Sequence, residues 1–78
     1  MIYNNKETKT IVNDARKVER KLNRIYKKTI LKSQVLEDLF NLKRAIEILV
    51  FWVNTRNEKH YLKKMVAVVR FIKAAYSI

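Results

Sequence analysis

Hydrophobic residues recur at alternating spacings of three and four along most of this chain. The hydrophobic positions of the first third are Ile11, Ala15, Val18, Leu22 and Ile25. This spacing places all five side chains on one side of an α-helix. Asn5 or Thr8 can cap the start of that helix through a side-chain oxygen. We therefore expect a first helix over residues 8–31.

The same spacing continues through the middle of the chain. Its hydrophobic positions are Val35, Leu39, Leu42, Ile46, Leu49 and Val53, and the neighbouring Leu36, Phe40 and Val50 widen that side. Ser33 is a suitable N-cap, and Glu37 and Asp38 follow in the early turns, where the helix dipole favours acids. We expect a second helix over residues 34–53. No glycine or proline enforces a break at Ser33, so one helix over residues 8–53 is the alternative.

The segment Asn54–Asn57 separates the second helix from a third. Thr55 followed by Glu58 matches a capping box, which predicts a helix over residues 56–77. Its hydrophobic positions are Leu62, Met65, Val69, Ile72 and Tyr76. The segments on either side of Asn54–Asn57 are also rich in β-branched and aromatic residues, so a pair of strands is an alternative. The helical spacing and the absence of glycine favour the helix.

These patterns predict one all-α domain over residues 1–78. It is either a three-helix bundle or a helical hairpin with a long first arm. The chain has no glycine and no cysteine, and His60 is its single histidine. Glycine-rich phosphate loops, disulfides and multi-histidine metal sites are therefore excluded. Nothing orients His60 toward Ser33 or Ser77 as a nucleophile–base pair. We expect no enzymatic activity, no cofactor, no metal and no small-molecule substrate.

The net charge of +11 is unevenly distributed along the chain. Residues 1–33 carry a net charge of +7, residues 34–54 carry −1 and residues 55–78 carry +5. Cations aligned without acids repel one another, so folding does not require them. This distribution predicts a polyanionic partner for the outer helices. The candidate nucleic-acid-binding residues are Arg16, Lys17, Arg20, Lys21, Arg24, Lys27, Lys28, Lys63 and Lys64.

The middle helix has little net charge and is the most apolar of the three. Toward its end, apolar residues surround the helix, and Ile48, Phe51 and Trp52 lie off its main hydrophobic side. We expect these three residues to stay exposed in a monomer and to form the interface of a homodimer. The alternative is that the third helix covers them.

The function that fits these features best is a non-enzymatic accessory protein that binds DNA or RNA through phosphate contacts. The alternative is a helical protein that acts at an anionic membrane surface, with Tyr26 or Trp52 as anchor, or on a protein partner as an immunity-like or inhibitory module. Small basic helical bundles of this kind are loosely similar in composition to bacteriocin immunity proteins, although no motif carries the likeness. The N-terminal residues lack the apolar run of a secretory signal, so we expect a cytoplasmic location.

Overall fold

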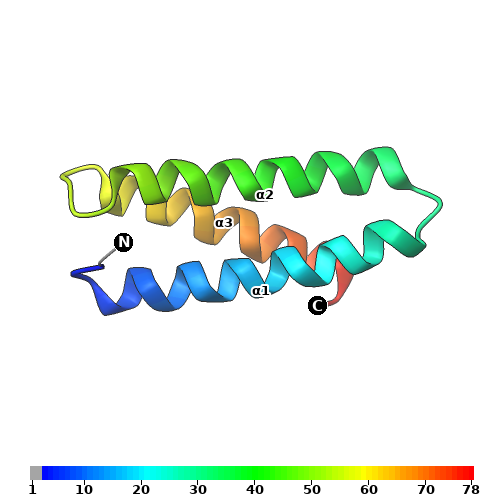
Figure 1. The fold of residues 1–78 in the computed structure, drawn as a ribbon, viewed down its shortest axis with the longest axis horizontal. Coiled ribbons are helices and arrows are strands. Elements are labelled where there is room, and N and C mark those ends of the chain that lie inside the picture. The colour runs from blue at the N-terminus through cyan, green and yellow to red at the C-terminus, as the bar shows by residue number, and fades with distance from the viewer. Residues whose placement is uncertain (1–2) are drawn as a thin grey trace.

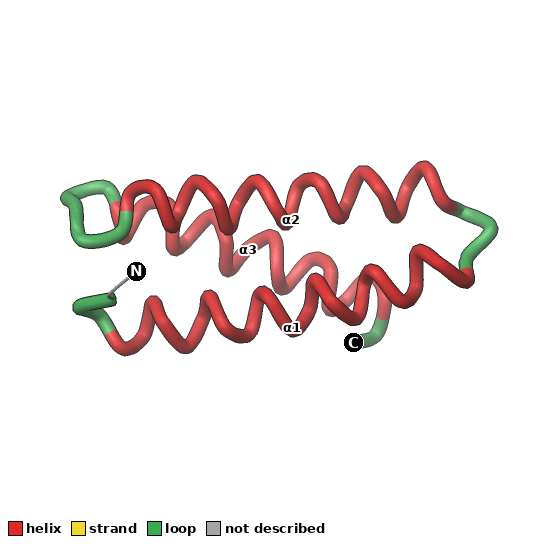
Figure 2. The backbone as a smooth tube through the Cα atoms, viewed as in Figure 1, coloured by secondary structure: helices red, strands yellow, loops and turns green. Residues whose placement is uncertain are grey.

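The computed structural model describes residues 3–78, which form three helices joined by two short turns (Figure 1). The helices are α1 (Lys6–Lys28), α2 (Lys32–Trp52) and α3 (Glu58–Tyr76). Each packs against the other two, so the all-α prediction is confirmed and the fold is a three-helix bundle. Figure 2 shows no strand in the described part of the chain, which excludes the strand pair around residues 54–57.

Helix α1 begins two residues earlier than expected and ends three residues earlier. The predicted cap Asn5 is confirmed, because its Oδ1 accepts the backbone N–H of Glu7 at 2.9 Å. The helix ends at Lys28, and Thr29 adopts an extended backbone. The hydroxyl of Thr29 accepts the N–H of Leu31 at 3.1 Å, which stabilises the turn into α2.

The predicted N-cap Ser33 is wrong, because α2 starts at Lys32 and Ser33 is an exposed residue within it. The capping position is Leu31, whose side chain has no oxygen to offer. Lys32 supports the turn instead: its Nζ donates to the Tyr26 carbonyl at 2.7 Å and lies 4.8 Å from the centre of the Tyr26 ring. The chain reverses direction here, which excludes a single helix over residues 8–53.

The predicted capping box at Thr55 and Glu58 is also wrong. The Thr55 hydroxyl donates to the carbonyl of Trp52 and accepts the N–H of Asn57 at 3.2 Å, so it organises the turn after α2. Helix α3 starts only at Glu58. The chain turns at Asn54, whose φ of 64° is left-handed, a conformation that asparagine tolerates better than most residues.

The core is formed by the three predicted hydrophobic sides. The buried hydrophobic residues are Val12, Ala15, Val18, Leu22, Val35, Leu39, Leu42, Ile46, Leu49, Val53, Leu62, Met65, Val69 and Ile72. Val12 is buried although the hydrophobic spacing did not include it. Ile11, Ile25 and Tyr76, which the spacing did include, are half-buried at the edge of the core. The resulting bundle is elongated, with extents of 41 × 21 × 17 Å.

A buried polar contact joins the start of α1 to the turn before α3. The Thr8 hydroxyl donates to Glu58 Oε2 at 2.9 Å, and the backbone N–H of Asn54 donates to Glu58 Oε1 at 2.7 Å. The Asn54 N–H contributes most to lowering the pKa of Glu58, and the Thr8 hydroxyl lowers it further, against the opposing effect of burial. Glu58 is therefore a buried carboxylate that is held ionised.

Two further side-chain contacts join the helices away from this end of the bundle. The Tyr76 hydroxyl donates to the Asp38 carboxylate, joining the end of α3 to the start of α2. Burial and the neighbouring Asp38 raise the pKa of Tyr76 to about 12. Lys73 forms an ion pair with Asp14 at 3.0 Å, joining α3 to α1.

Candidate functional site

The outward side of α1 carries an uninterrupted set of cations. We call this surface the basic face of α1, and its seven residues are all exposed: Arg16, Lys17, Arg20, Lys21, Arg24, Lys27 and Lys28. They lie on the side of the helix opposite the buried Val12, Val18 and Leu22. None of the seven forms an ion pair within residues 3–78. Their charges therefore remain available to a partner.

The acids of α1 lie at the borders of this surface. Asp14 is paired with Lys73 of α3, and Glu19 is half-buried in a depression that also contains Lys43 of α2. Glu7 lines a second depression, between α1 and α3. The acids therefore face the neighbouring helices, which leaves the outward side of α1 without a negative charge.

Lys63 and Lys64 do not form one cluster with the basic face of α1. Lys63 lies with Glu7 and Arg70 along the depression between α1 and α3. Lys64 lies in the groove between α2 and α3, with its Nζ 5.9 Å from the centre of the Tyr61 ring. The two residues are consecutive on a helix and point in different directions. The basic face is therefore formed by α1 alone, whereas Lys63 and Lys64 belong to two separate surfaces beside α3.

The turn between α1 and α2 exposes two hydrophobic residues. Ile30 is 96% exposed and Leu31 is 61% exposed. The basic residues Lys27, Lys28 and Lys32 adjoin them in the sequence and are exposed as well. This end of the bundle therefore combines a protruding apolar tip with several cations.

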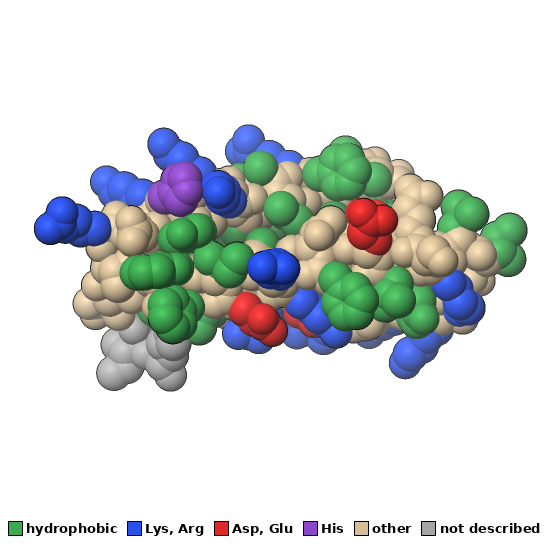
Figure 3. All heavy atoms as spheres, turned by 90° about the horizontal axis from the view of Figure 1, so that it is seen from above, with side chains coloured by type: hydrophobic (Ala, Val, Ile, Leu, Met, Phe, Trp, Pro, Cys, Tyr) green, Lys and Arg blue, Asp and Glu red, His purple; other side chains and the backbone are tan. Residues whose placement is uncertain are grey.

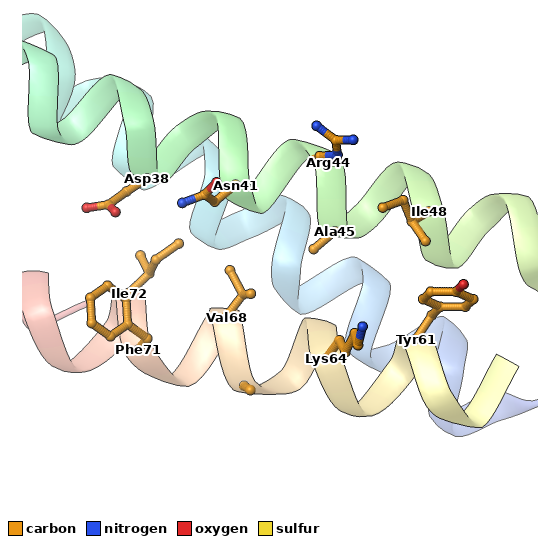
Figure 4. Close-up of a pocket in the computed structure, with 11 residues that line it drawn as sticks. Asp38, Asn41, Arg44, Ala45, Ile48, Tyr61, Lys64, Val68, Phe71 and Ile72 are labelled. Atoms are coloured by element: carbon orange, nitrogen blue, oxygen red, sulfur yellow. The ribbon is translucent and has the colours of Figure 1, made fainter. Parts of the chain in front are cut away.

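A groove of about 460 Å³ runs between α2 and α3 (Figure 4). Ala45, Val68 and Ile72 contribute apolar side chains to it, and Tyr61 and Ile48 lie together at one end. Asp38, at the other end, already accepts the Tyr76 hydroxyl. Within residues 3–78, no three histidine, cysteine or acidic side chains gather in a way that would hold a metal ion.

Two of the three predicted dimer residues are partly covered by α3. Ile48 is half-buried, and Trp52 is half-buried and stacks on Tyr61 with ring centroids 6.0 Å apart. The expectation that they stay exposed was wrong, because α3 packs against that side of α2. Phe51 is 75% exposed, as expected.

Phe40, which was predicted to widen the hydrophobic side of the second helix, is 62% exposed, and so is Phe71 of α3. Seen from the α2 side, hydrophobic side chains form several patches that a cation and acidic side chains separate, and most other Lys and Arg lie toward the edges (Figure 3). Phe40 points outward because it follows the buried Leu39, and successive side chains of a helix are about 100° apart.

No known protein family, no curated protein and no solved structure matches this chain. None of the helices in the described part of the chain is long and apolar enough to cross a membrane.

Proposed function

We propose that this protein binds nucleic acid through contacts between the basic face of α1 and backbone phosphates. The observation that carries the proposal is the set of seven exposed, unpaired cations with no acid among them. A duplex carries one negative charge per roughly 1.7 Å of its axis, so it offers the matching linear array of charge.

The cations are costly unless a partner neutralises them. Arg16, Arg20 and Arg24 follow one another at spacings of four, and like charges at that spacing destabilise a helix by about 0.2–0.5 kcal/mol per pair. From Arg16 to Lys28 the helix rises about 18 Å, which brings the row past several phosphates of one strand. A side chain that contacts phosphates fixes position without reading bases, so we expect little sequence preference.

A fluorescence-anisotropy titration tests the proposal directly. Labelled random-sequence duplex DNA and single-stranded RNA are compared with heparin at several salt concentrations. Neutralising about five phosphates of a duplex gives a slope near −4.5 in a plot of log K against log salt. If the protein binds DNA and RNA no more tightly than it binds heparin, or if the affinity does not depend on salt, nucleic-acid binding is contradicted.

Matched variants locate the contact surface. Arg20→Glu with Arg24→Glu reverses two charges in the middle of the basic face and is expected to reduce DNA affinity at least a hundredfold. Arg56→Glu with Lys59→Glu makes the same change in net charge at exposed positions near the α2–α3 turn. We expect this control to reduce affinity less than tenfold. Equal losses in the two variants would show that only the net charge matters.

A second candidate function is binding to an anionic membrane surface, and the exposed tip of the first turn favours it. The tip formed by Ile30 and Leu31 supplies the apolar group that enters a lipid interface, and Lys27, Lys28 and Lys32 supply the attraction to lipid headgroups. Tyr26 and Trp52 fit the role of anchor less well, because both are half-buried.

Vesicle sedimentation separates the two functions. Membrane binding predicts that phosphatidylserine-containing vesicles bind the protein and that Ile30→Ser with Leu31→Ser reduces this binding at least tenfold. The same variant is expected to leave DNA affinity unchanged, because both substituted residues are uncharged. Absence of vesicle binding at low salt would contradict the membrane function.

A further inference from the structure

We propose that two copies of this chain associate in antiparallel orientation through one outward stripe of α2. The stripe consists of Phe40, Arg44, Glu47 and Phe51, and we call it the α2 stripe. This inference goes beyond nucleic-acid binding and uses a different helix, so it holds or fails independently of that function.

The four residues form a continuous line on the exposed side of α2. Their spacings of four, three and four place them on one side of a helix, about 16 Å from end to end. Phe40 is 62% exposed, Phe51 is 75% exposed, and Arg44 and Glu47 are both exposed. Neither Arg44 nor Glu47 forms an ion pair within residues 3–78. The structure thus leaves two aromatic rings and two opposite charges available on one line.

The stripe is complementary to itself when one copy is turned end to end. A two-fold axis between residues 45 and 46 places Phe40 opposite Phe51 of the second copy. The same axis places Arg44 opposite Glu47 of the second copy, and does so twice, as an isologous interface requires. A parallel arrangement in register would instead set Arg44 against Arg44 and Glu47 against Glu47. Charge therefore selects the antiparallel arrangement.

The charge distribution of the molecule makes α2 the place where a second copy can approach. Residues 34–54 carry a net charge of −1, whereas the segments before and after carry +7 and +5. Two copies can approach closely only where this repulsion is smallest. In the proposed pair α1 lies on the far side of each α2, and its basic face stays exposed. Charges separated by more than about 8 Å are largely screened at physiological salt.

The area available indicates a weak dimer. Four phenylalanine rings with these exposures bury roughly 500 Å² together, about half of what a specific interface needs. Leu36 and Ile48, beside the stripe, add to that area. We therefore expect dissociation in the micromolar range.

Sedimentation velocity of the full chain between about 5 and 500 μM measures the association. Arg44→Glu places two acids opposite each other at both positions, and Glu47→Arg places two cations there. Each variant is expected to raise the dimer dissociation constant at least tenfold. The double variant Arg44→Glu with Glu47→Arg restores both opposite-charge pairs, and we expect a dissociation constant within threefold of the unmodified protein.

Two further variants complete the test. Phe51→Glu removes a ring from the interface and is expected to leave a monomer. Arg70→Glu makes the same change in net charge as Arg44→Glu at an exposed position on α3 and is expected to leave the dimer intact. Circular dichroism confirms that each variant is helical. A monomer at 500 μM would overturn the proposal. A dimer that is unaffected by Arg44→Glu and by Glu47→Arg would also overturn it, and so would a double variant that fails to restore the dimer.

Discussion

Thr8 donates its hydroxyl hydrogen to the Glu58 carboxylate over 2.9 Å, although the two residues lie fifty positions apart in the chain. Thr8 is fully buried and Glu58 is 8% exposed, so water cannot replace this hydrogen bond when it is lost. The contact closes the end of the bundle where α1 begins and α3 begins. It makes a polar pair part of an otherwise apolar interior.

Thr8→Val tests the contribution of this hydrogen bond to stability. Valine keeps the shape of threonine but leaves one oxygen of a buried carboxylate without its donor, which costs about 1–3 kcal/mol. The free energy of unfolding, measured by urea denaturation at pH 7, is expected to fall by that amount. Thr10→Val is the matched control, because Thr10 is exposed and its hydroxyl bonds only within its own helix. An unchanged free energy for Thr8→Val would contradict the role of this pair.

The lowered pKa of Glu58 makes stability depend on acid. A carboxyl whose pKa is lower in the folded state stabilises the fold above its ordinary pKa of 4.5, and this contribution disappears as the pH falls through the folded value. Glu58→Gln is therefore expected to be less stable than the unmodified protein at pH 7, by about 1–2 kcal/mol. The difference in free energy of unfolding between the two proteins, measured by urea denaturation at several pH values, should become smaller below about pH 4. A gap that stays constant with pH would mean that the charge of Glu58 is irrelevant.

Tyr76 predicts a second dependence on pH, at the alkaline end. The pKa of Tyr76 is raised from 10.0 to about 12. Its contribution to the free energy of unfolding is therefore complete below pH 10 and is lost as the pH rises toward 12. Tyr76→Phe removes the hydrogen bond to Asp38 and is expected to cost about 0.5–1.5 kcal/mol at pH 7. Compared with the unmodified protein, the variant should lose less stability between pH 10 and pH 12. Identical alkaline profiles would contradict this assignment.

The core predicts a sharp contrast between two neighbouring positions of α2. Leu42 is fully buried, and Leu42→Ala is expected to lower the free energy of unfolding by about 2–5 kcal/mol. Phe40→Ala removes a larger side chain that is 62% exposed, and we expect a loss below about 1 kcal/mol. Thermal denaturation at low protein concentration, where a dimer does not contribute, compares the two. Equal losses would mean that α2 is rotated about its axis relative to the structure described here.

Hydrophobic spacing predicted the three helices and most of the core, because residues at this spacing lie on one side of their helix, and Leu22, Leu42 and Met65 are buried in one cluster. The same spacing could not locate the helix ends. Ser33 and Thr55 both had the chemistry of a cap, but the backbone turns at Thr29–Leu31 and at Asn54, where local hydrogen bonds hold it.

The sequence predicted the basic face of α1 but not the contacts that partly cover Trp52. The basic face of α1 follows directly from the sequence, because a cation opposite a buried side has to face water. The partly covered state of Trp52 could not be predicted, since it depends on where Tyr61 of another helix lies. The pairing of Thr8 with Glu58 was equally hidden, because no spacing connects two residues in different helices.

The three helices run along the long axis of the bundle, so the chain begins at one end of the molecule and finishes toward the other (Figure 1). Asn4 is bonded to Asn54 at one end, whereas the chain ends beside the second half of α1, toward the other end (Figure 1). Tension applied through both ends therefore acts parallel to all three helices. The helices must slide past one another before they separate, and their interdigitated side chains oppose this sliding. The bundle is therefore loaded in shear, and its contacts break together and not one at a time.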